Sequence, residues 1–180
     1  SRQPAPVADR NPIPETLDAL VIGAGVAGLY QLYQLRAQGL KAHACDTASD
    51  VGGTWYWNRY PGAKFDSEAY IYQYLFDEDL YKGWTWSERF PAQPEIERWM
   101  HYIADKLDLR RDISFSTTVT AARFDETRQI WRVTTNQGEA IETRFLIGCT
   151  GMLSAPLEDR FPGQASFKGK ILHTARYPRG

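Results

Sequence analysis

Three glycines in the run GAGVAG, at positions 23, 25 and 28, have the spacing of a dinucleotide-binding turn. Gly23 permits a tight turn, Gly25 lets a pyrophosphate approach the backbone, and Gly28 lets a helix pack closely on a strand. The run follows the apolar segment LDALVI and opens a segment with helical spacing. Because a helix N-terminus presents N–H groups and a positive dipole, this context predicts a phosphate site, which the glycines alone would indicate only weakly.

A carboxylate stands where such a turn requires one. Asp46 ends the next apolar segment, LKAHACD. It can accept hydrogen bonds from the ribose hydroxyls of an adenosine, and it would repel a 2′-phosphate. The ligand of this turn is therefore expected to be FAD or NAD rather than NADP.

The stretch GGTWYWNRYPGAKFD, residues 52–66, decides between these two ligands. A flavin needs a second close backbone approach beside its ribityl and pyrophosphate groups, which Gly52 and Gly53 could provide. It also needs aromatic walls near its ring, and these favour FAD. The alternative is that Trp55, Tyr56 and Trp57 are ordinary core or interface aromatics.

The elements that must position these residues form a β-α-β unit. A strand from Leu17 leads through the glycines into a helix that stops near Gly39, and LKAHACD follows as a second, parallel strand. One face of this helix is predicted to hold Val26, Leu29, Tyr33 and Leu35. A second helix is predicted in PAQPEIERWMHYIADKLDL, with Pro94 in its first turn. The segments ISFSTTVTAARFDE, IWRVTTNQG and AIETRFLIGCTG read as strands.

The predicted fold class is α/β, a Rossmann-type doubly wound FAD-binding domain with a small antiparallel β-meander. We expect a proline-rich extended arm over residues 1–16, the FAD-binding domain over 17–155 and a linker over 156–180. The run FLIGCTG, which ends at Thr150 and Gly151, is apolar enough for a buried parallel strand.

Composition excludes several function classes. The net charge of -1 gives no electrostatic footprint for nucleic acid, and no apolar run could cross a bilayer. Cys45 and Cys149 lie in apolar stretches, which favours buried thiols in a reducing, cytoplasmic setting over a disulfide or a metal site.

These residues together carry a resemblance. GAGVAG, GGTWYWNRYPGAKFD, FLIGCTG and FKGKILHTARYP resemble the N-terminal, FAD-binding part of a type I Baeyer–Villiger monooxygenase of the phenylacetone and steroid monooxygenase kind, from about Leu17 onward. The resemblance implies an enzyme that uses FAD, NADPH and O₂ to insert one oxygen atom into a ketone, giving an ester or lactone through a flavin C4a-peroxide. It also implies that an NADP-binding domain needed for activity lies beyond Gly180, so that the chain is truncated before it.

The resemblance also implies residue roles. His173 lies in a fingerprint with Phe167, Gly169 and Tyr177, and would couple domain movement to catalysis. Asp66 would hold an Arg of the missing domain near the flavin, the alternative being that Asp66 caps the segment that follows. Lys64, Phe65 and Asp66 match a segment that touches NADP where the two cofactors meet. The positions implied to line FAD are Ala27, Asp46, Thr54, Trp55, Tyr56, Trp57, Asp66, Tyr72 and Val119.

Three departures from the family pattern keep rival functions open. Asp46 replaces a more usual Glu, and Lys64-Phe65 stand where Arg and a small or aliphatic residue are common. Tyr177 replaces Trp, as in related flavin monooxygenases that oxidise nitrogen or sulfur. The rivals are therefore a heteroatom-oxidising flavin monooxygenase and a non-catalytic FAD-binding module.

Overall fold

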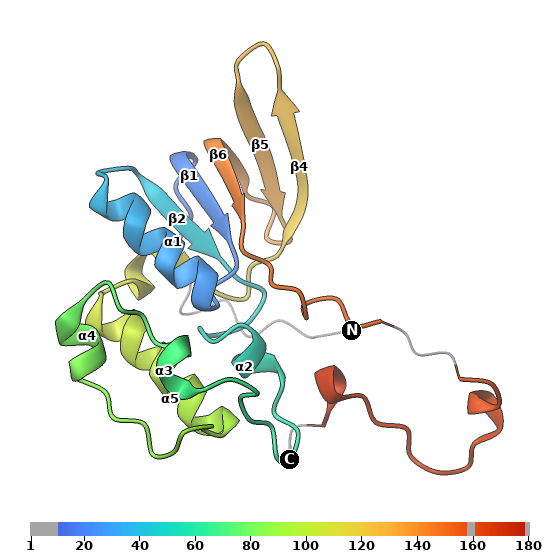
Figure 1. The fold of residues 1–180 in the computed structure, drawn as a ribbon. Helices are drawn as coiled ribbons and strands as arrows, with labels where there is room; N and C mark the ends of the chain where they lie inside the picture. Colours follow the sequence, from blue (N-terminus) through green and yellow to red (C-terminus); the bar gives the residue numbers. More distant parts are fainter. Residues whose placement is uncertain (1–10, 158–160, 179–180) are drawn as a thin grey trace.

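The computed structural model describes residues 11–157 and 161–178. At its centre lies a six-stranded sheet with the order β3-β2-β1-β6-β5-β4 (Figure 1). The strands are β1 (Thr16–Ile22), β2 (Ala42–Cys45), β3 (Ile113–Ser114), β4 (Val119–Asp125), β5 (Ile130–Thr135) and β6 (Ala140–Gly148).

The sheet has a parallel half and an antiparallel half that share one strand. β1 pairs in parallel with both β2 and β6, and β2 pairs in parallel with β3. β6 also pairs antiparallel with β5, which pairs antiparallel with β4. The predicted meander is present, and its last strand is also a strand of the parallel core. This arrangement confirms the predicted α/β fold class.

Two longer helices pack on one face of the sheet, together with the short helices of the aromatic region. The glycine turn leads into the crossover helix α1, and α5 begins one residue before Pro94. The aromatic region between them holds only single helical turns, as its lack of periodicity suggested. The helices are α1 (Val26–Ala37), α2 (Thr54–Trp57), α3 (Ala69–Tyr72), α4 (Glu78–Lys82) and α5 (Gln93–Lys106), with 3₁₀ turns η2 (Arg110–Asp112), η3 (Gln164–Ser166) and η4 (Thr174–Arg176).

The buried face of α1 differs in part from the predicted one. Leu29, Leu32 and Leu35 are buried against the sheet, whereas Val26 and Tyr33 are only partly buried. The helix axis is set by Gly28, which lies on the same face and brings the start of α1 against the strand ends. The buried face of α1 is therefore the one that contains Gly28, and it includes Leu32, which was not among the predicted residues.

Apolar side chains gather on both faces of the sheet. The larger cluster joins α1, α5 and the aromatic region to β1 and β2. The smaller cluster packs Ile13, Leu17 and Leu20 against the meander, and no residue of a described helix belongs to it. Among the described residues, no helix is both long and apolar enough to cross a membrane.

Part of the predicted N-terminal arm is attached to the domain. The Asn11 side chain donates hydrogen bonds to the carbonyl oxygens of Arg110 and Ile113, and Ile13 is buried. Residues 1–10 lie outside the described residues. The described portion thus covers the edge of the sheet at β3.

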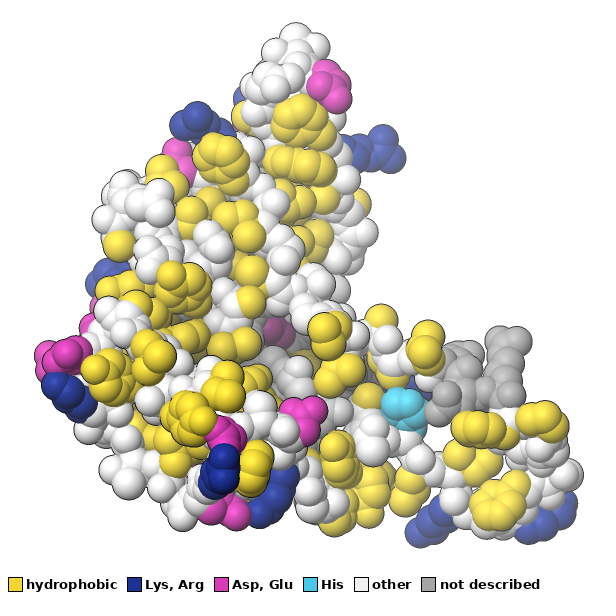
Figure 2. Space-filling view, viewed as in Figure 1, with side chains coloured by type: hydrophobic (Ala, Val, Ile, Leu, Met, Phe, Trp, Pro, Cys, Tyr) yellow, Lys and Arg dark blue, Asp and Glu magenta, His cyan; other side chains and the backbone are white. Residues whose placement is uncertain are grey.

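The segment after β6 runs outside the packed layers (Figure 1). Met152 is 94% exposed and Leu157 is 83% exposed. Figure 2 shows apolar side chains at the surface of this segment as well as over the main body. Exposed apolar side chains in such number are typical of a surface that contacts another domain.

The glycine turn locks the start of α1 onto the sheet. Gly23 has φ +112, which favours glycine, and a Cβ added at Gly28 would lie 1.8 Å from the Gly23 carbonyl oxygen. No side chain fits at either position without moving backbone atoms.

We predict that Gly28→Ala lowers the free energy of unfolding by about 1–3 kcal/mol or more, because the added methyl group overpacks a rigid backbone contact. Chemical denaturation of the full-length apoprotein measures the change. Gly148→Ala is the matched control, since a Cβ there meets nothing within 4 Å. Equal stability of the two variants would contradict the packing role of Gly28.

Candidate cofactor site

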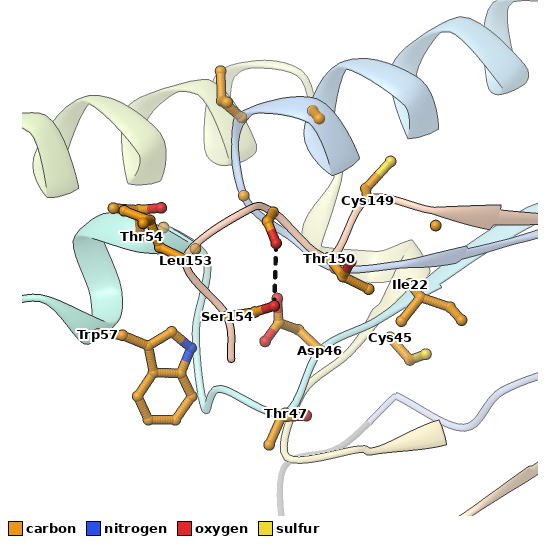
Figure 3. A pocket seen from close by; sticks show the side chains of 18 of the residues that line it. Ile22, Cys45, Asp46, Thr47, Thr54, Trp57, Cys149, Thr150, Leu153 and Ser154 are labelled. Carbon is orange, nitrogen blue, oxygen red and sulfur yellow. Dashed lines mark hydrogen bonds between the residues drawn. The ribbon is translucent and has the colours of Figure 1, made fainter. Parts of the chain in front are cut away.

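A cavity of about 520 Å³ lies beyond the carboxyl ends of β1, β2 and β6. Its walls are the glycine turn, the end of β2, the loop that carries α2, the approach to β4 and the segment after β6. Figure 3 shows Thr54 and Trp57 of α2 on one side, and Asp46 and Thr47 after β2 on another. Ligands of open parallel sheets bind at this edge, in a volume of this order.

The two glycine loops that border the cavity touch each other. A Cβ added at Gly53 would lie 2.8 Å from the Gly25 Cα, and one added at Gly25 would lie 3.2 Å from the Gly53 Cα. The Gly52 N–H donates to the Ala24 carbonyl oxygen at 3.2 Å. The loops therefore form one continuous backbone surface, free of side chains at its centre, of the kind that a pyrophosphate can approach.

This contact changes the interpretation of Gly25. The sequence predicted that the space at Gly25 serves the approach of a pyrophosphate, whereas in the structure Gly53 already limits that space. A Gly25→Val variant would separate the two loops whether or not a ligand is bound. Loss of FAD from that variant would therefore not by itself identify the pyrophosphate site.

Asp46 holds the glycine turn while it faces the cavity. Its Oδ2 accepts from the Ala24 N–H at 2.6 Å, and its Oδ1 accepts from the Ala48 N–H at 2.7 Å. Burial raises the pKa of this carboxyl, and the two backbone hydrogen bonds oppose that effect. An ionised carboxylate has about four acceptor sites, so acceptor capacity remains for ribose hydroxyls.

The predicted aromatic residues divide into two groups. Trp57 and Tyr72 line the cavity together with Thr54. Trp55 does not line it, but donates a hydrogen bond from its indole to the Tyr72 hydroxyl oxygen at 2.8 Å. Tyr56 is buried, with its hydroxyl bonded to Ser49.

Phe65 and Lys64 lie away from the cavity. Phe65 is buried with its ring centroid 4.9 Å from that of Trp55 and 4.2 Å from that of Tyr72. Lys64 is exposed and its Nζ contacts both carboxylate oxygens of Glu88, at 2.9 Å and 2.8 Å. Phe65 thus supports the aromatic group from behind, and Lys64 belongs to an ion pair at the surface.

Asp66 is exposed and does not cap the helix that follows it. The N-cap position of α3 is Glu68, and no side chain caps that helix. Asp66 is close enough to the cavity to raise the pKa of Tyr72, as a smaller effect beside burial. The alternative role as a helix cap is therefore excluded.

His173 shapes the segment that follows it. Its Nδ1 accepts from the Ala175 N–H at 3.1 Å and thereby caps η4. Ala175 lines the cavity. The fingerprint segment thus reaches the site through Ala175, and His173 fixes its conformation at that point.

Of the residues predicted to bind the cofactor, ten line the cavity: Gly23, Gly25, Ala27, Asp46, Gly52, Gly53, Thr54, Trp57, Tyr72 and Val119. Gly28, Trp55, Tyr56, Lys64, Phe65, Asp66 and His173 do not. Sequence reasoning missed the wall after β6, which comprises Cys149, Thr150, Gly151, Leu153 and Ser154, and it missed Thr117 and Thr118 before β4. Because FLIGCTG was recognised as a parallel strand, the rule that ligands bind past such strand ends could have found residues 149–151.

The described residues contain no group of three or more His, Cys, Asp or Glu side chains that could hold a metal ion. Within the same residues, Cys45 is a free and buried thiol whose pKa burial raises to about 12, and Cys149 is a free, half-buried one. The donor set at the cavity is backbone N–H, one carboxylate and hydroxyls. This set suits the phosphates and sugars of a dinucleotide rather than a cation.

Residues 18–180 match the family model described as flavin-binding monooxygenase-like. The chain belongs to this family. The resemblance to Baeyer–Villiger monooxygenases is confirmed as well, since they are among the relatives that cover most of the chain. FAD and NADP are the cofactors of this group.

Two curated relatives and one solved structure give the scale of similarity. The chain is 68% identical to the acetone monooxygenase (methyl acetate-forming) of Gordonia sp. (strain TY-5), over 91% of the chain and 31% of that protein. It is 44% identical to the phenazine N-monooxygenase PhzNO1 of Lysobacter antibioticus, over 89% of the chain and 30% of that protein. A structure of oxidized steroid monooxygenase bound to NADP superimposes with a TM-score of 0.82 at 47% identity, covering 91% of the chain and 31% of that structure. The chain therefore spans about a third of the length of these family members.

We predict that Asp46→Ala weakens FAD binding by about 1.5–3 kcal/mol, because it removes a charge-assisted ribose contact and releases the glycine turn. Titration of the full-length apoprotein with FAD, followed by flavin fluorescence, measures the dissociation constant. Asp18→Ala is the control, since Asp18 Oδ2 also accepts a backbone N–H, that of Lys41 at 2.8 Å, at the opposite end of the sheet. Equal affinities for the two variants would restrict Asp46 to a structural role.

Proposed function

We propose that this chain is the FAD-binding part of a Baeyer–Villiger monooxygenase that uses NADPH and O₂ to convert a ketone into an ester or lactone. The observation that carries the proposal is the cavity at the strand ends, where two touching glycine loops and Asp46 offer the contacts of a dinucleotide. The similarity to a methyl acetate-forming acetone monooxygenase supports a ketone as the substrate.

The residues of this chain would bind and orient the cofactor. The N–H groups at the start of α1 and the joined backbone of Gly25 and Gly53 would hold the pyrophosphate, and Asp46 the adenosine ribose. Trp57 and Tyr72 would form walls that exclude water from the flavin. FAD, when bound, supplies the redox and oxygen chemistry, so we assign no nucleophile or general acid to this chain.

Activity would require a second, NADP-binding domain outside this chain. The exposed apolar side chains of the segment after β6, including Met152 and Leu157, support such a contact. Two free thiols, Cys45 and Cys149, are compatible with the cytoplasmic location that we propose.

The second candidate function is the oxidation of nitrogen or sulfur. It is supported by Tyr177 in place of the family Trp and by the similarity to a phenazine N-monooxygenase. Product analysis of the full-length protein with FAD, NADPH, acetone and an aryl methyl sulfide distinguishes the two. Ester without sulfoxide would support the first candidate, and sulfoxide without ester would overturn it in favour of the second.

Asp66 gives a sharper test of the proposed reaction. Its exposed carboxylate, which caps no helix, would hold a cationic side chain from the missing domain beside the flavin. We predict that Asp66→Ala retains FAD and the fold, yet loses ester formation by roughly 10²-fold, the scale for one electrostatic stabiliser. NADPH consumption would continue, with hydrogen peroxide as the product.

The measurement compares ester formed, hydrogen peroxide formed and NADPH consumed in the full-length enzyme. Glu126→Ala removes another exposed carboxylate, in the turn between β4 and β5, and should leave all three unchanged. A normal ester yield from Asp66→Ala would refute the electrostatic role.

His173 tests whether the fingerprint segment limits the reaction. His173→Ala removes the cap of η4 and should slow ester formation while FAD content stays normal, because gating segments can limit turnover. Stopped-flow measurement of flavin reduction by NADPH, together with steady-state ester formation, reports both half-reactions. If both rates match those of the wild type, His173 serves only to shape its own turn.

A further inference from the structure

Tyr72 and Trp55 are joined by a hydrogen bond whose direction is fixed by chemistry. The Trp55 Nε1 and the Tyr72 hydroxyl oxygen are 2.8 Å apart. An indole N–H can only donate, so the tyrosine oxygen must be the acceptor. The hydroxyl proton of Tyr72 therefore points away from Trp55.

Aromatic rings and the cavity together border Tyr72. Tyr72 lines the cavity, whereas Trp55 and Phe65 pack against the Tyr72 ring, with ring centroids 6.2 Å and 4.2 Å from its own. Among the described residues, Trp55 donates a hydrogen bond to the Tyr72 hydroxyl, and the charge of Asp66 raises the pKa of Tyr72. The cavity therefore offers space for an acceptor of this proton.

The same bond makes Tyr72 a better donor. Burial raises the pKa of Tyr72, and the hydrogen bond received from Trp55 acts against that rise. A hydroxyl that accepts a hydrogen bond is polarised, so that its own O–H donates more strongly. A buried tyrosine hydroxyl that accepts such a hydrogen bond is suited to donate its own to a neutral or anionic acceptor.

Trp55 is itself held in place from behind. The Gln93 side chain at the start of α5 donates from Nε2 to the Trp55 carbonyl oxygen at 2.6 Å. The Trp55 ring meets Phe65 edge-on, with ring centroids 4.9 Å apart. The indole therefore has a fixed position from which to orient Tyr72.

We propose that Trp55 is a positioning residue that directs the Tyr72 hydroxyl proton into the cavity, where Tyr72 donates a hydrogen bond to an acceptor atom of FAD. This rests on the proposed function only in that the cavity holds FAD. Trp55, absent from the cavity wall, would act on the cofactor through Tyr72.

A double-mutant cycle tests the proposal. FAD dissociation constants are measured for the full-length apoprotein and for Trp55→Phe, Tyr72→Phe and the double variant. Each single variant should weaken FAD binding by about 3- to 10-fold, the scale of one hydrogen bond. Trp55→Phe should have no further effect in the Tyr72→Phe background, because the hydroxyl through which it acts is already gone.

Trp86→Phe is the matched control. This variant also removes an indole N–H, which donates to the Gln73 side-chain oxygen at 3.1 Å. Neither Trp86 nor Gln73 lines the cavity. FAD affinity of Trp86→Phe should equal that of the wild type. A general loss of aromatic packing would lower the affinity in both backgrounds of the cycle alike, so it cancels from the coupling.

Additive effects of the two variants would overturn the proposal, as would an unchanged dissociation constant for Trp55→Phe. Failure of the wild-type full-length protein to bind FAD would instead refute the proposed function. The two failures are therefore distinguishable in the same set of titrations.

Discussion

The backbones of Gly25 and Gly53 pack so closely that a side chain at Gly53 would clash with Gly25, and one at Gly25 would require Gly53 to move. This contact joins the loop after β1 to the loop after β2, and the hydrogen bond from Gly52 to Ala24 reinforces it. Because Gly53 is also the N-cap residue of α2, the contact sets where the α2 side chains lie. Asp46 ties the first loop to the end of β2 through Ala24. One backbone contact and one carboxylate thus hold together the side of the cavity formed by the loops after β1 and β2.

The sequence predicted those parts of the structure that a short local pattern determines. The β-α-β unit, its glycines and Asp46 lie within one short stretch and obey rules of turn geometry and helix ends. The split within the aromatic stretch could not be predicted, since α2 is a single turn without a detectable period. In that turn Thr54 and Trp57 are three residues apart and share the face toward the cavity, whereas Trp55 and Tyr56 do not.

The remaining parts of the site depend on contacts that are distant in sequence. Cys149 and Ser154 line the cavity because β6 pairs with β1 in parallel. The apolar run of β6 predicts a parallel strand, but its neighbour in the sheet is set by contacts distant in sequence. Lys64, Asp66 and His173 were assigned by resemblance alone. In the structure Lys64 forms a surface ion pair, Asp66 is exposed in a bend, and His173 caps the 3₁₀ turn η4. The roles proposed for them involve a domain outside this chain, so neither the sequence pattern nor the packing of this chain can define them.

The shared strand β6 also has a consequence for how the protein is made. β1 can complete its pairing only when residues 142–148 are present, since Thr16 pairs with Glu142 and Ile22 pairs with Gly148. Closing so long a loop is slow, and an unpaired apolar edge can recruit other chains while it waits. During synthesis, β1 therefore emerges from the ribosome well before its partner. The nascent chain therefore passes through an interval with an exposed strand edge, which lasts until Gly148 has emerged and can pair with Ile22.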